Sequence, residues 1–364
     1  MTNKEYWYWL CNIDGIGNRK IKSLFRLFPS PEAVYFAKER ELSYVQGLKH
    51  SDIQMIKESK QHLSEKIEEY SKLKSVNIKF VTVEDNEYPK RLKNIYDSPY
   101  ALYVKGNIPE DSKPTVAIIG ARNCSNYGKE MAYYYGKELA GYGIQIISGM
   151  AMGIDSYGQW GALESGNTFA ILGSGIDVCY PKQNIELYMK LQEKGGVISE
   201  YGIGKKPLPY YFPMRNRIIS GLSDCIVVIE AKQKSGSFIT VDQALEQGKE
   251  VFALPGRVSD ALSLGCNELI KNGANMLLNT EEILEFFHIS QKNNGINEKK
   301  IKKMLAKEEK IIYSCLSLEP KHVDVIIQET KLSFSNVISI LIQLELEGMV
   351  IQPIKNHYTI VPFH

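Results

Sequence analysis

Short apolar runs alternate with helical patterns through the middle of the chain. The first run, Val116–Ile119, is rich in β-branched residues, which is typical of a strand buried on both faces of a parallel sheet. Five further strands are predicted at Ile144–Ile147, Thr168–Leu172, Gly196–Ile198, Cys225–Ile229 and Glu250–Ala253. The predicted helices between them are Tyr127–Ala140, Asp155–Glu164, Ile185–Glu193, Pro213–Leu222 and Thr240–Gln247. This alternation predicts an α/β domain with a doubly wound parallel sheet over residues 112–288.

Residues 1–80 show a different, helical pattern. Helices are predicted at Tyr6–Cys11, Arg19–Phe28, Asp52–Lys60 and 62–74. The turn Ile13–Gly17 is typical of a helix-hairpin-helix, whose glycines let backbone N–H groups approach a phosphate, and Val45–Leu48 is a weaker copy. A helical bundle whose glycines are only C-caps explains the same pattern, and the two readings stay open. Strands are predicted at Ile78–Val83 and Ala101–Val104, with 81–111 as a connecting segment.

The end of the chain predicts a third domain. Residues 291–310 hold seven Lys against three Glu, which predicts a linker or a solvated helix there, and 289–308 is assigned as a linker. After it, 309–364 predicts a winged-helix-like domain with helices at Glu309–Leu316, Val323–Glu329 and Phe334–Glu347, a cap at Gly348, and strands at Val350–Ile354 and His357–Val361. The third helix carries no Lys or Arg, so we expect a structural or protein-contact role and no reading of a DNA groove.

Overall composition narrows the class of protein only slightly. The net charge is +2, but residues 1–80 hold 14 Lys or Arg against 10 Asp or Glu, whereas 112–287 hold 16 against 18. The six cysteines form no close pairs, which argues against a zinc cluster or a disulfide framework and suits a reducing cytoplasm. No apolar run is long enough for a membrane span, and Asp14 comes too early for a secretion signal. We therefore expect a cytoplasmic protein without a membrane partner.

Cations gather in the segments that follow the predicted strands. Nine of the 16 Lys and Arg residues of the middle domain lie in these segments: Arg122, Lys182, Lys205, Lys206, Arg215, Arg217, Lys232, Lys234 and Arg257. Parallel strands end at one edge of the sheet, so these charges predict a focused anion site. Small residues that permit close backbone approach accompany them: Gly120, Ser148, Gly149, Gly153 and Gly173. Ser235–Ser237 offers a phosphate nest at a helix start, as does the helix after Arg122. Tyr180, Tyr210, Tyr211 and Phe212 are candidates either for stacking on bases or for rim packing.

Several familiar catalytic patterns are missing from this edge. Neither a G-x-G-x-x-G fingerprint nor a P-loop is present, and all six histidines lie outside 112–287. We therefore expect no catalytic residues, no metal and no cofactor. Asp155 is expected to cap a helix, and Glu200 and Glu230 to tie loops together or to pair with arginines. Because Arg215 and Arg217 cannot share one helix face, we expect one to point into the crevice and the other to be held by a carboxylate, with Asn216 bonded to the loop backbone.

The chain resembles the DprA/Smf family of DNA-processing proteins. The matching motifs are GARNCSNYG (120–128), SGMAMGID (148–155), GAL (161–163), YPKQN (180–184), SE (199–200), FPMRNRIISGLS (212–223), VVIEAKQKSGSFIT (227–240), PGR (255–257) and GCNELIKNGA (265–274). They cover almost all of the middle domain in the family's order. One departure is Gly158-Gln159, where the family usually has Ala-His.

The resemblance implies a Rossmann-like domain that binds single-stranded DNA without sequence preference. It also implies a homodimer through that domain and loading of the RecA recombinase during natural transformation. Phosphate contacts carry over to Arg122 and Lys182, with Lys205 or Lys206 as a further contact. The expected DNA-binding set is Arg122, Lys182, Lys205, Lys206, Phe212, Arg215, Asn216, Arg217, Ser235, Gly236, Ser237 and Thr240.

An enzymatic alternative comes from nucleotide phosphoribohydrolases of the LOG type, whose turn PGGxGTxxE is similar to SGS-x-IT here. Counted from Thr240, the position of their catalytic glutamate is Gln243. Because an amide cannot act as a general base, binding is the preferred hypothesis.

Overall fold

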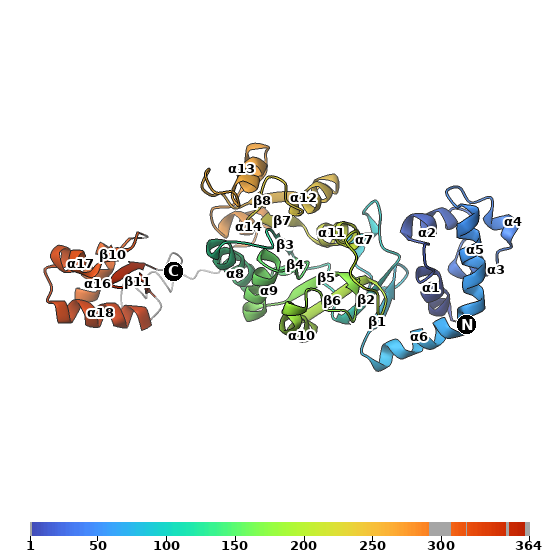
Figure 1. Cartoon of the computed structure of the whole chain (residues 1–364), viewed down its shortest axis with the longest axis horizontal. Coiled ribbons are helices and arrows are strands. Elements are labelled where there is room, and N and C mark those ends of the chain that lie inside the picture. Colours follow the sequence, from blue (N-terminus) through green and yellow to red (C-terminus); the bar gives the residue numbers. More distant parts are fainter. Residues whose placement is uncertain (1, 291–306, 318, 347–348, 361–364) are drawn as a thin grey trace. The chain divides into compact units, whose positions relative to one another are not determined.

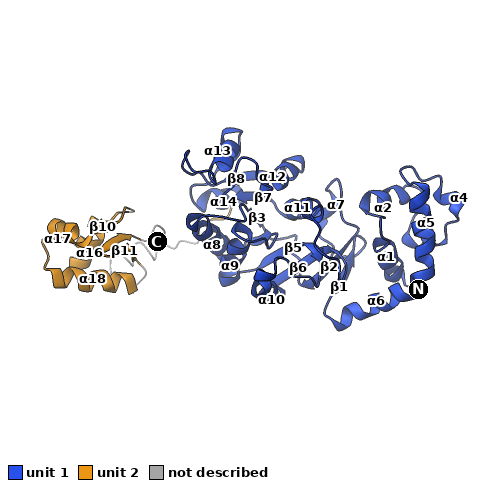
Figure 2. Cartoon of the chain, in the orientation of Figure 1, with its two compact units in different colours: residues 1–287 blue, residues 288–364 orange. Residues whose placement is uncertain are grey.

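The computed structural model describes residues 2–290, 307–317, 319–346 and 349–360. The chain forms two compact units, residues 1–287 and 288–364 (Figures 1 and 2). Each is described by itself below.

A nine-stranded sheet forms the centre of the first unit (Figure 1). Its strands are β1 (Lys79–Thr82), β2 (Ala101–Gly106), β3 (Thr115–Ile119), β4 (Gln145–Ser148), β5 (Thr168–Gly175), β6 (Gly195–Tyr201), β7 (Cys225–Val228), β8 (Glu250–Ala253) and β9 (Asn275–Met276). Their order is β1-β2-β6-β5-β4-β3-β7-β8-β9. Strands β3 to β9 pair in parallel, and all six strands predicted for the middle domain are confirmed. Between β3 and β7 the winding direction reverses, and ligands bind at such a switch point in doubly wound sheets.

The connecting segment 81–111 proves to be part of the sheet. Strand β2 pairs antiparallel with β6 along Tyr103–Gly106, and β1 pairs antiparallel with β2. Both strands were predicted, but their place in the sheet was not. The apolar side chains of β2 supply the reason, because Leu102 and Val104 are fully buried in the same core as Ile198 of β6.

Helices cover both faces of the sheet. They are α7 (Lys90–Lys93), α8 (Asn126–Gly141), α9 (Ile154–Ser165), α10 (Ile185–Glu193), α11 (Tyr211–Leu222), α12 (Ser237–Glu246), α13 (Leu264–Lys271) and α14 (Glu281–Phe286). Apolar side chains of α11, α12 and α13 pack in one core with Ala117 and Ile119 of β3. Helices α8 and α9 lie back to back, because a Cβ at Gly136 would overlap the carbonyl oxygen of Gly158. Side chains of α9 and α10 join a second core. Helices α7, α13 and α14 and strand β9 were not predicted.

The N-terminal helices are α1 (Asn3–Cys11), α2 (Asn18–Leu24), α3 (Pro31–Phe36), α4 (Glu39–Leu42), α5 (His50–Ser59) and α6 (Leu63–Ser75). They share a core of their own, but Trp7 and Tyr8 of α1 pack with Phe80 and Tyr103 of the sheet. The helical region therefore belongs to the same compact unit as the sheet. The glycine turn lies between α1 and α2 as predicted, with Gly15 at φ +79°. Helices α3 and α4 were not predicted.

Among its described residues the second unit has the helices α16 (Lys307–Cys315), α17 (Val323–Thr330) and α18 (Phe334–Leu346). Its sheet has the order β10-β12-β11, with β10 at Lys321–His322, β11 at Val350–Ile354 and β12 at His357–Ile360. This arrangement confirms the three predicted helices and the hairpin. The predicted cap at Gly348, the end of the last strand at Val361 and most of the linker 289–308 lie outside the described residues. No single described helix is long and apolar enough to cross a bilayer; α17 and α18 meet that criterion only as a pair, bent by 114°.

Candidate nucleic-acid interface

A cleft of about 690 Å³ opens at the switch point of the sheet. Its walls are the loop after β3, the N-terminal turns of α11, and the segment from Lys232 to Thr240 between β7 and α12. Nine of the predicted site residues line it: Gly120, Arg122, Phe212, Arg215, Asn216, Ser235, Gly236, Ser237 and Thr240. Segments from three separate parts of the sequence therefore form one site, as the strand-end rule predicts.

The start of α8 is not open to an external anion, contrary to the expectation from its sequence. The Glu230 side chain, which is only 2% exposed, accepts hydrogen bonds from the backbone N–H and the hydroxyl of Ser125. Ser125 is the N-cap of α8 and in turn accepts from the N–H of Gly128 at 3.0 Å. An intramolecular carboxylate thus occupies this helix N-terminus. Glu230 ties two loops together, as predicted. The groups that remain available to an anion are those of Arg122 and the start of α12.

Arg122 is exposed on the cleft wall. Its guanidinium carbon lies 5.7 Å from the centre of the Phe212 ring, whose centre is 5.5 Å from that of Tyr180. Cation–π contact of this kind holds a guanidinium in place while leaving its N–H groups available. Tyr180 and Phe212 both line the cleft, whereas Tyr211 stacks on Tyr201 at 3.9 Å and so has the rim-packing role.

The opposite wall begins at α12. The hydroxyls of Ser235 and Ser237 lie 2.8 Å apart, and the Phe238 N–H donates to the Ser235 carbonyl. This turn places Gly236, the N-cap of a ten-residue helix, on the cleft without a side chain over its backbone. Two exposed lysines, Lys232 and Lys234, lie on the same wall, so N–H groups and two cations face one space.

Arg215 lines the floor of the cleft but is not free. Its side chain is 5% exposed and donates to the carbonyl oxygens of Gly149, at 2.9 Å, and Ile171. Burial lowers the pKa of Arg215 to about 10, against the attraction of Asp155. Asn216 accepts from Arg215 Nε at 3.1 Å, so its partner is this arginine and not the loop backbone. Arg215 is therefore a structural clamp between the end of β4, β5 and α11, and the expectation that one of the two arginines would be free in the crevice was wrong.

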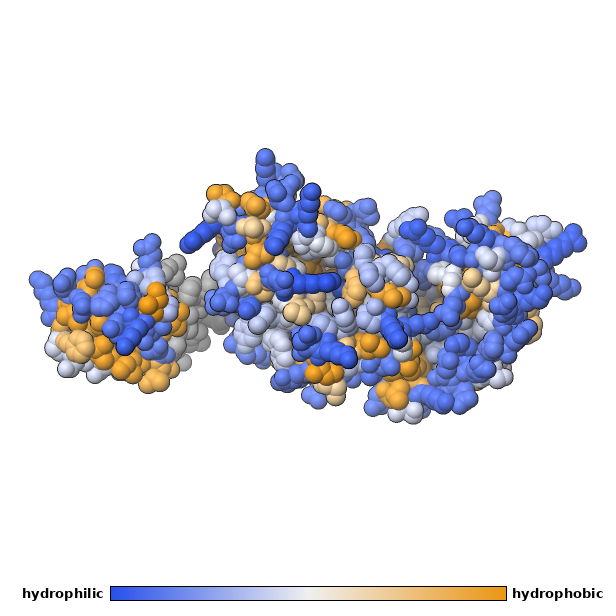
Figure 3. Space-filling view, viewed as in Figure 1, coloured by the Kyte–Doolittle hydropathy of each residue, from blue (hydrophilic) through white to orange (hydrophobic). Residues whose placement is uncertain are grey.

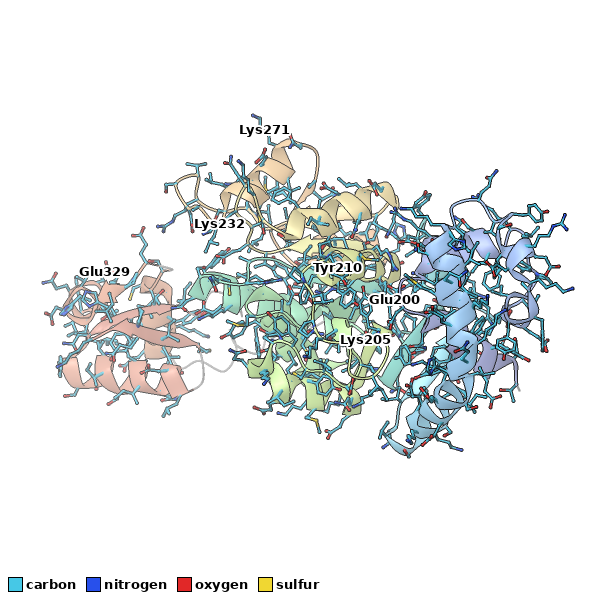
Figure 4. All side chains as sticks on the ribbon, turned by 45° about the vertical axis from the view of Figure 1, so that its right-hand side comes forward. Glu200, Lys205, Tyr210, Lys232, Lys271 and Glu329 are labelled. Carbon is cyan, nitrogen blue, oxygen red and sulfur yellow. The ribbon has the colours of Figure 1, made fainter. Side chains whose placement is uncertain are left out.

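Arg217 is the arginine of the pair that carboxylates hold, a choice that the sequence left open. Its Nη2 lies 2.7 Å from both oxygens of Glu200, and its Nε lies 3.4 Å from Asp97. Burial alone would lower the pKa of Arg217, but the two carboxylates outweigh it and raise that pKa. Asn18 of α2 donates to the same Glu200, so the network joins the N-terminal helices to α11. Figure 4 shows Glu200 on the side of the sheet that faces those helices.

Three predicted lysines lie outside the lining of the cleft. Lys182 and Lys206 are exposed, whereas the Lys205 ammonium pairs with Asp14 at 2.7 Å. Their contacts with DNA remain predictions. A DNA phosphate would have to compete with the Asp14 carboxylate for the Lys205 ammonium.

Four of the predicted phosphate-loop residues serve packing around the cleft. Ser148 donates to the Ile118 carbonyl at 2.6 Å, and a Cβ at Gly173 would approach the Phe212 ring to 2.7 Å. Gly149 leaves room for the Arg215 guanidinium, and Gly153 (φ +79°) for the loop after β3. Asp155 lies in the first turn of α9 and accepts from the Gly149 N–H, while Gly153 is the N-cap, so the predicted cap role was wrong.

Two features bear on whether the cleft could do chemistry. Among the described residues, no group of three or more His, Cys, Asp or Glu is placed to hold a metal ion. Gln243, at the position of the hydrolase glutamate, donates to the Pro213 carbonyl at 3.2 Å and does not line the cleft.

Comparison with known proteins identifies the family. The family profile described as DNA recombination-mediator protein A matches residues 79–288, and that of the DprA winged helix domain matches 300–352. The chain belongs to the DprA/Smf family. It is 42% identical over 204 residues to DNA processing protein DprA of Streptococcus pneumoniae, which covers 56% of this chain and 72% of that protein. It is also 34% identical over 293 residues to Protein Smf of Synechocystis, and that match covers 78% of this chain and 73% of the Synechocystis protein.

Two solved structures of DprA proteins are similar. The X-ray structure of DprA from Streptococcus pneumoniae superposes with a TM-score of 0.67 at 33% identity, over 78% of this chain and 98% of that one. The structure of DNA processing protein A from Helicobacter pylori, described as having a unique single-stranded DNA binding mode, superposes with a TM-score of 0.53 at 31% identity. The match covers 57% of this chain and 95% of that one. The DprA profile begins at residue 79 and so includes β1 and β2. The Rossmann-like fold and the winged-helix domain expected from the sequence are both confirmed.

Lys232 and Lys234 are the site residues that sequence reasoning undervalued. Both were counted among the strand-end cations, but neither was placed in the site. The sequence feature that could have placed them in the site is their position immediately before the Ser235–Ser237 turn. Gln159, where a histidine was expected from the resemblance, is fully buried and its amide donates to the Phe169 carbonyl at 3.0 Å, so it serves packing between α9 and β5.

Proposed function

We propose that this protein binds single-stranded DNA without sequence preference, with the sugar-phosphate backbone in the cleft at the switch point. The observation that carries this proposal is the convergence of Arg122, Lys232 and Lys234 on one cleft that also exposes aromatic rings. Within the described part of the chain, none of these three cations forms an ion pair with a carboxylate. Unpaired cations attract phosphates, and ring faces stack on any base, so the site favours affinity over sequence reading. The described binding mode of the Helicobacter pylori relative supports the same conclusion.

We propose further that the protein acts without catalysis, as a homodimer through its Rossmann-like domain, and loads RecA onto the bound strand during natural transformation. The family description as a recombination mediator supports this role. A cytoplasmic location fits the six cysteines, all of which are free. Faster RecA filament assembly on coated single strands would support the loading step, and free base released from nucleoside monophosphates would instead support the hydrolase alternative.

The first prediction concerns strand preference. The protein should bind a single-stranded oligonucleotide at least tenfold more tightly than the duplex of the same sequence, because stacking needs exposed base faces (about 1–3 kcal/mol per base). Fluorescence anisotropy with both probes at one salt concentration measures the ratio. Equal affinities would contradict the proposed function.

The second prediction concerns the second compact unit. Deleting residues 291–364 should leave single-strand affinity within about threefold, because the unit has its own core and α18 carries no Lys or Arg. The measurement is anisotropy on the truncated protein, with circular dichroism to show that it is folded. A loss of tenfold or more, about 1.4 kcal/mol, would show that this unit contributes to binding.

A further inference from the structure

A second cationic surface lies on α2, outside the cleft. Arg19, Lys22 and Arg26 are spaced three and four residues apart, so they project from one side of α2 and its following turn. Lys93 at the end of α7 and Tyr96 after it complete what we call the α2 surface. The Lys22 ammonium lies 5.2 Å from the centre of the Tyr96 ring, which joins two segments that are far apart in sequence. In Figure 1, α2 and α7 face each other.

The charges of the α2 surface are uncompensated. All four cations are exposed, and over the described ranges none of them forms an ion pair with a carboxylate. By contrast, the neighbouring Lys20 on α2 pairs with the buried Asp52 at 2.7 Å. The cations of α2 thus divide into one that stabilises the fold and others that face solvent. The N-terminal helices present a largely hydrophilic surface in Figure 3, as expected for a region that meets a charged ligand.

Tyr96 gives this surface a second property. Its ring is 83% exposed, more than any other tyrosine among the exposed large side chains of the described chain. The ring offers a flat apolar face directly beside cations, a combination that suits a ligand with both a flat apolar face and negative charge. Single-stranded nucleic acid has both, since unpaired bases present their faces and each nucleotide carries a phosphate.

A network of hydrogen bonds connects the α2 surface with the cleft. Asn18, which precedes Arg19, donates to Glu200, and Asp97, which follows Tyr96, accepts from Arg217. Arg217 lies on α11 two residues after Arg215, which lines the cleft. The two surfaces therefore flank α11, with Arg217 bonded towards the α2 surface and Arg215 in the lining of the cleft.

We infer that the α2 surface is a second contact site for the same single strand, engaged only by strands long enough to leave the cleft. The inference rests on the proposed function and extends it to residues 19–26 and 93–96, of which the first segment lies outside the matched family profile. Lys22, Arg19 and Arg26 contact phosphates, and Tyr96 stacks on a base.

The test compares strand lengths. Arg19→Gln/Lys22→Gln/Arg26→Gln should weaken binding of an oligo-dT of about 30 nucleotides roughly tenfold and lower its salt slope by about 2, since each phosphate contact on a single strand contributes about 0.7. Binding of an oligo-dT of about 6 nucleotides, which fills only the cleft, should change less than about twofold. Tyr96→Ala should weaken only the long probe, about tenfold, and Tyr96→Phe should retain its affinity.

The matched control removes three exposed cations elsewhere on the same helical region, Lys38→Gln/Arg40→Gln/Lys49→Gln, and should leave both probes unaffected. If the control weakens the long probe equally, the effect is net charge and the inference is wrong. Unchanged long-probe affinity in the α2 variant, or a loss seen only with duplex DNA, also overturns it. Failure of the proposed function is distinct, because the unsubstituted protein would then bind neither single-stranded probe, which refutes both.

Discussion

Arg217→Ala should lower the free energy of unfolding by about 3–5 kcal/mol, the cost of removing one partner from a buried ion pair. Its side chain is 8% exposed and that of Glu200 is 13% exposed, so the carboxylate would stay buried without its charge partner. Asp97 and Asn18 would lose part of the same network. Chemical denaturation monitored by circular dichroism measures the change.

The control for Arg217 is the double variant Arg217→Met/Glu200→Gln. Removing both charges leaves no unpaired ion, so the double variant should be more stable than Arg217→Ala. Lys57→Ala is the second control, since Lys57 pairs with Glu39 on the surface and should contribute less than about 1 kcal/mol. If Arg217→Ala changes stability no more than Lys57→Ala, the network does not hold α11 as the structure indicates.

Arg122→Ala should weaken single-strand binding about tenfold for every sequence and lower the salt slope by about 0.7, the contribution of one phosphate. The side chain is exposed and no ion pair would be broken among the described residues, so thermal stability should be unchanged. Adding Lys232→Ala and Lys234→Ala should bring the loss to on the order of a hundredfold and the slope change to about 2. The measurement is anisotropy over a series of salt concentrations.

Lys271→Ala provides the matched control for the cleft variants. Lys271 is also exposed but lies on α13 and is not among the residues that line the cleft, and Figure 4 shows it well apart from Lys232. It should leave both affinity and salt slope unchanged. Equal losses in Lys271→Ala and Arg122→Ala would mean that binding follows net charge and not the cleft.

Arg215 and Arg217 show where sequence reasoning reached its limit. The helical period placed them on different faces of α11, and that division is confirmed. The expectation that one of the two would be held by a carboxylate such as Glu200 or Glu230 was also confirmed, and the structure shows that the paired arginine is Arg217, on Glu200. The role of Arg215 was not, because its partners are the carbonyl oxygens of Gly149 and Ile171, and backbone acceptors leave no mark in a sequence.

What the sequence by itself determined is the fold and the edge that carries the site. Apolar runs such as Val116–Ile119 alternate with helical patterns, and burial on both faces of a parallel sheet makes that pattern readable. Because parallel strands all end at the same edge, the sequence is enough to place Arg122 and Ser235–Ser237 at one edge, and the pairing of β3 with β7 then brings them together. The winged-helix domain could be predicted for the same reason. Its helices and hairpin follow from the spacing of apolar residues and from the turn residues between them, which are local features of the sequence.

Only the tertiary structure decided which groups at that edge remain available to a ligand. Glu230 fills the helix N-terminus that the sequence offered to a phosphate, and Lys205 is neutralised by Asp14, 191 positions away. Strand β2 joins the sheet by pairing with β6, from Tyr103 opposite Ser199 to Gly106 opposite Gly196, and β1 joins it through β2. The contact between Lys22 and Tyr96 likewise joins two segments that are far apart in sequence. Charge pairing and burial depend on which distant segments meet, whereas periodicity records only the local preference of each segment.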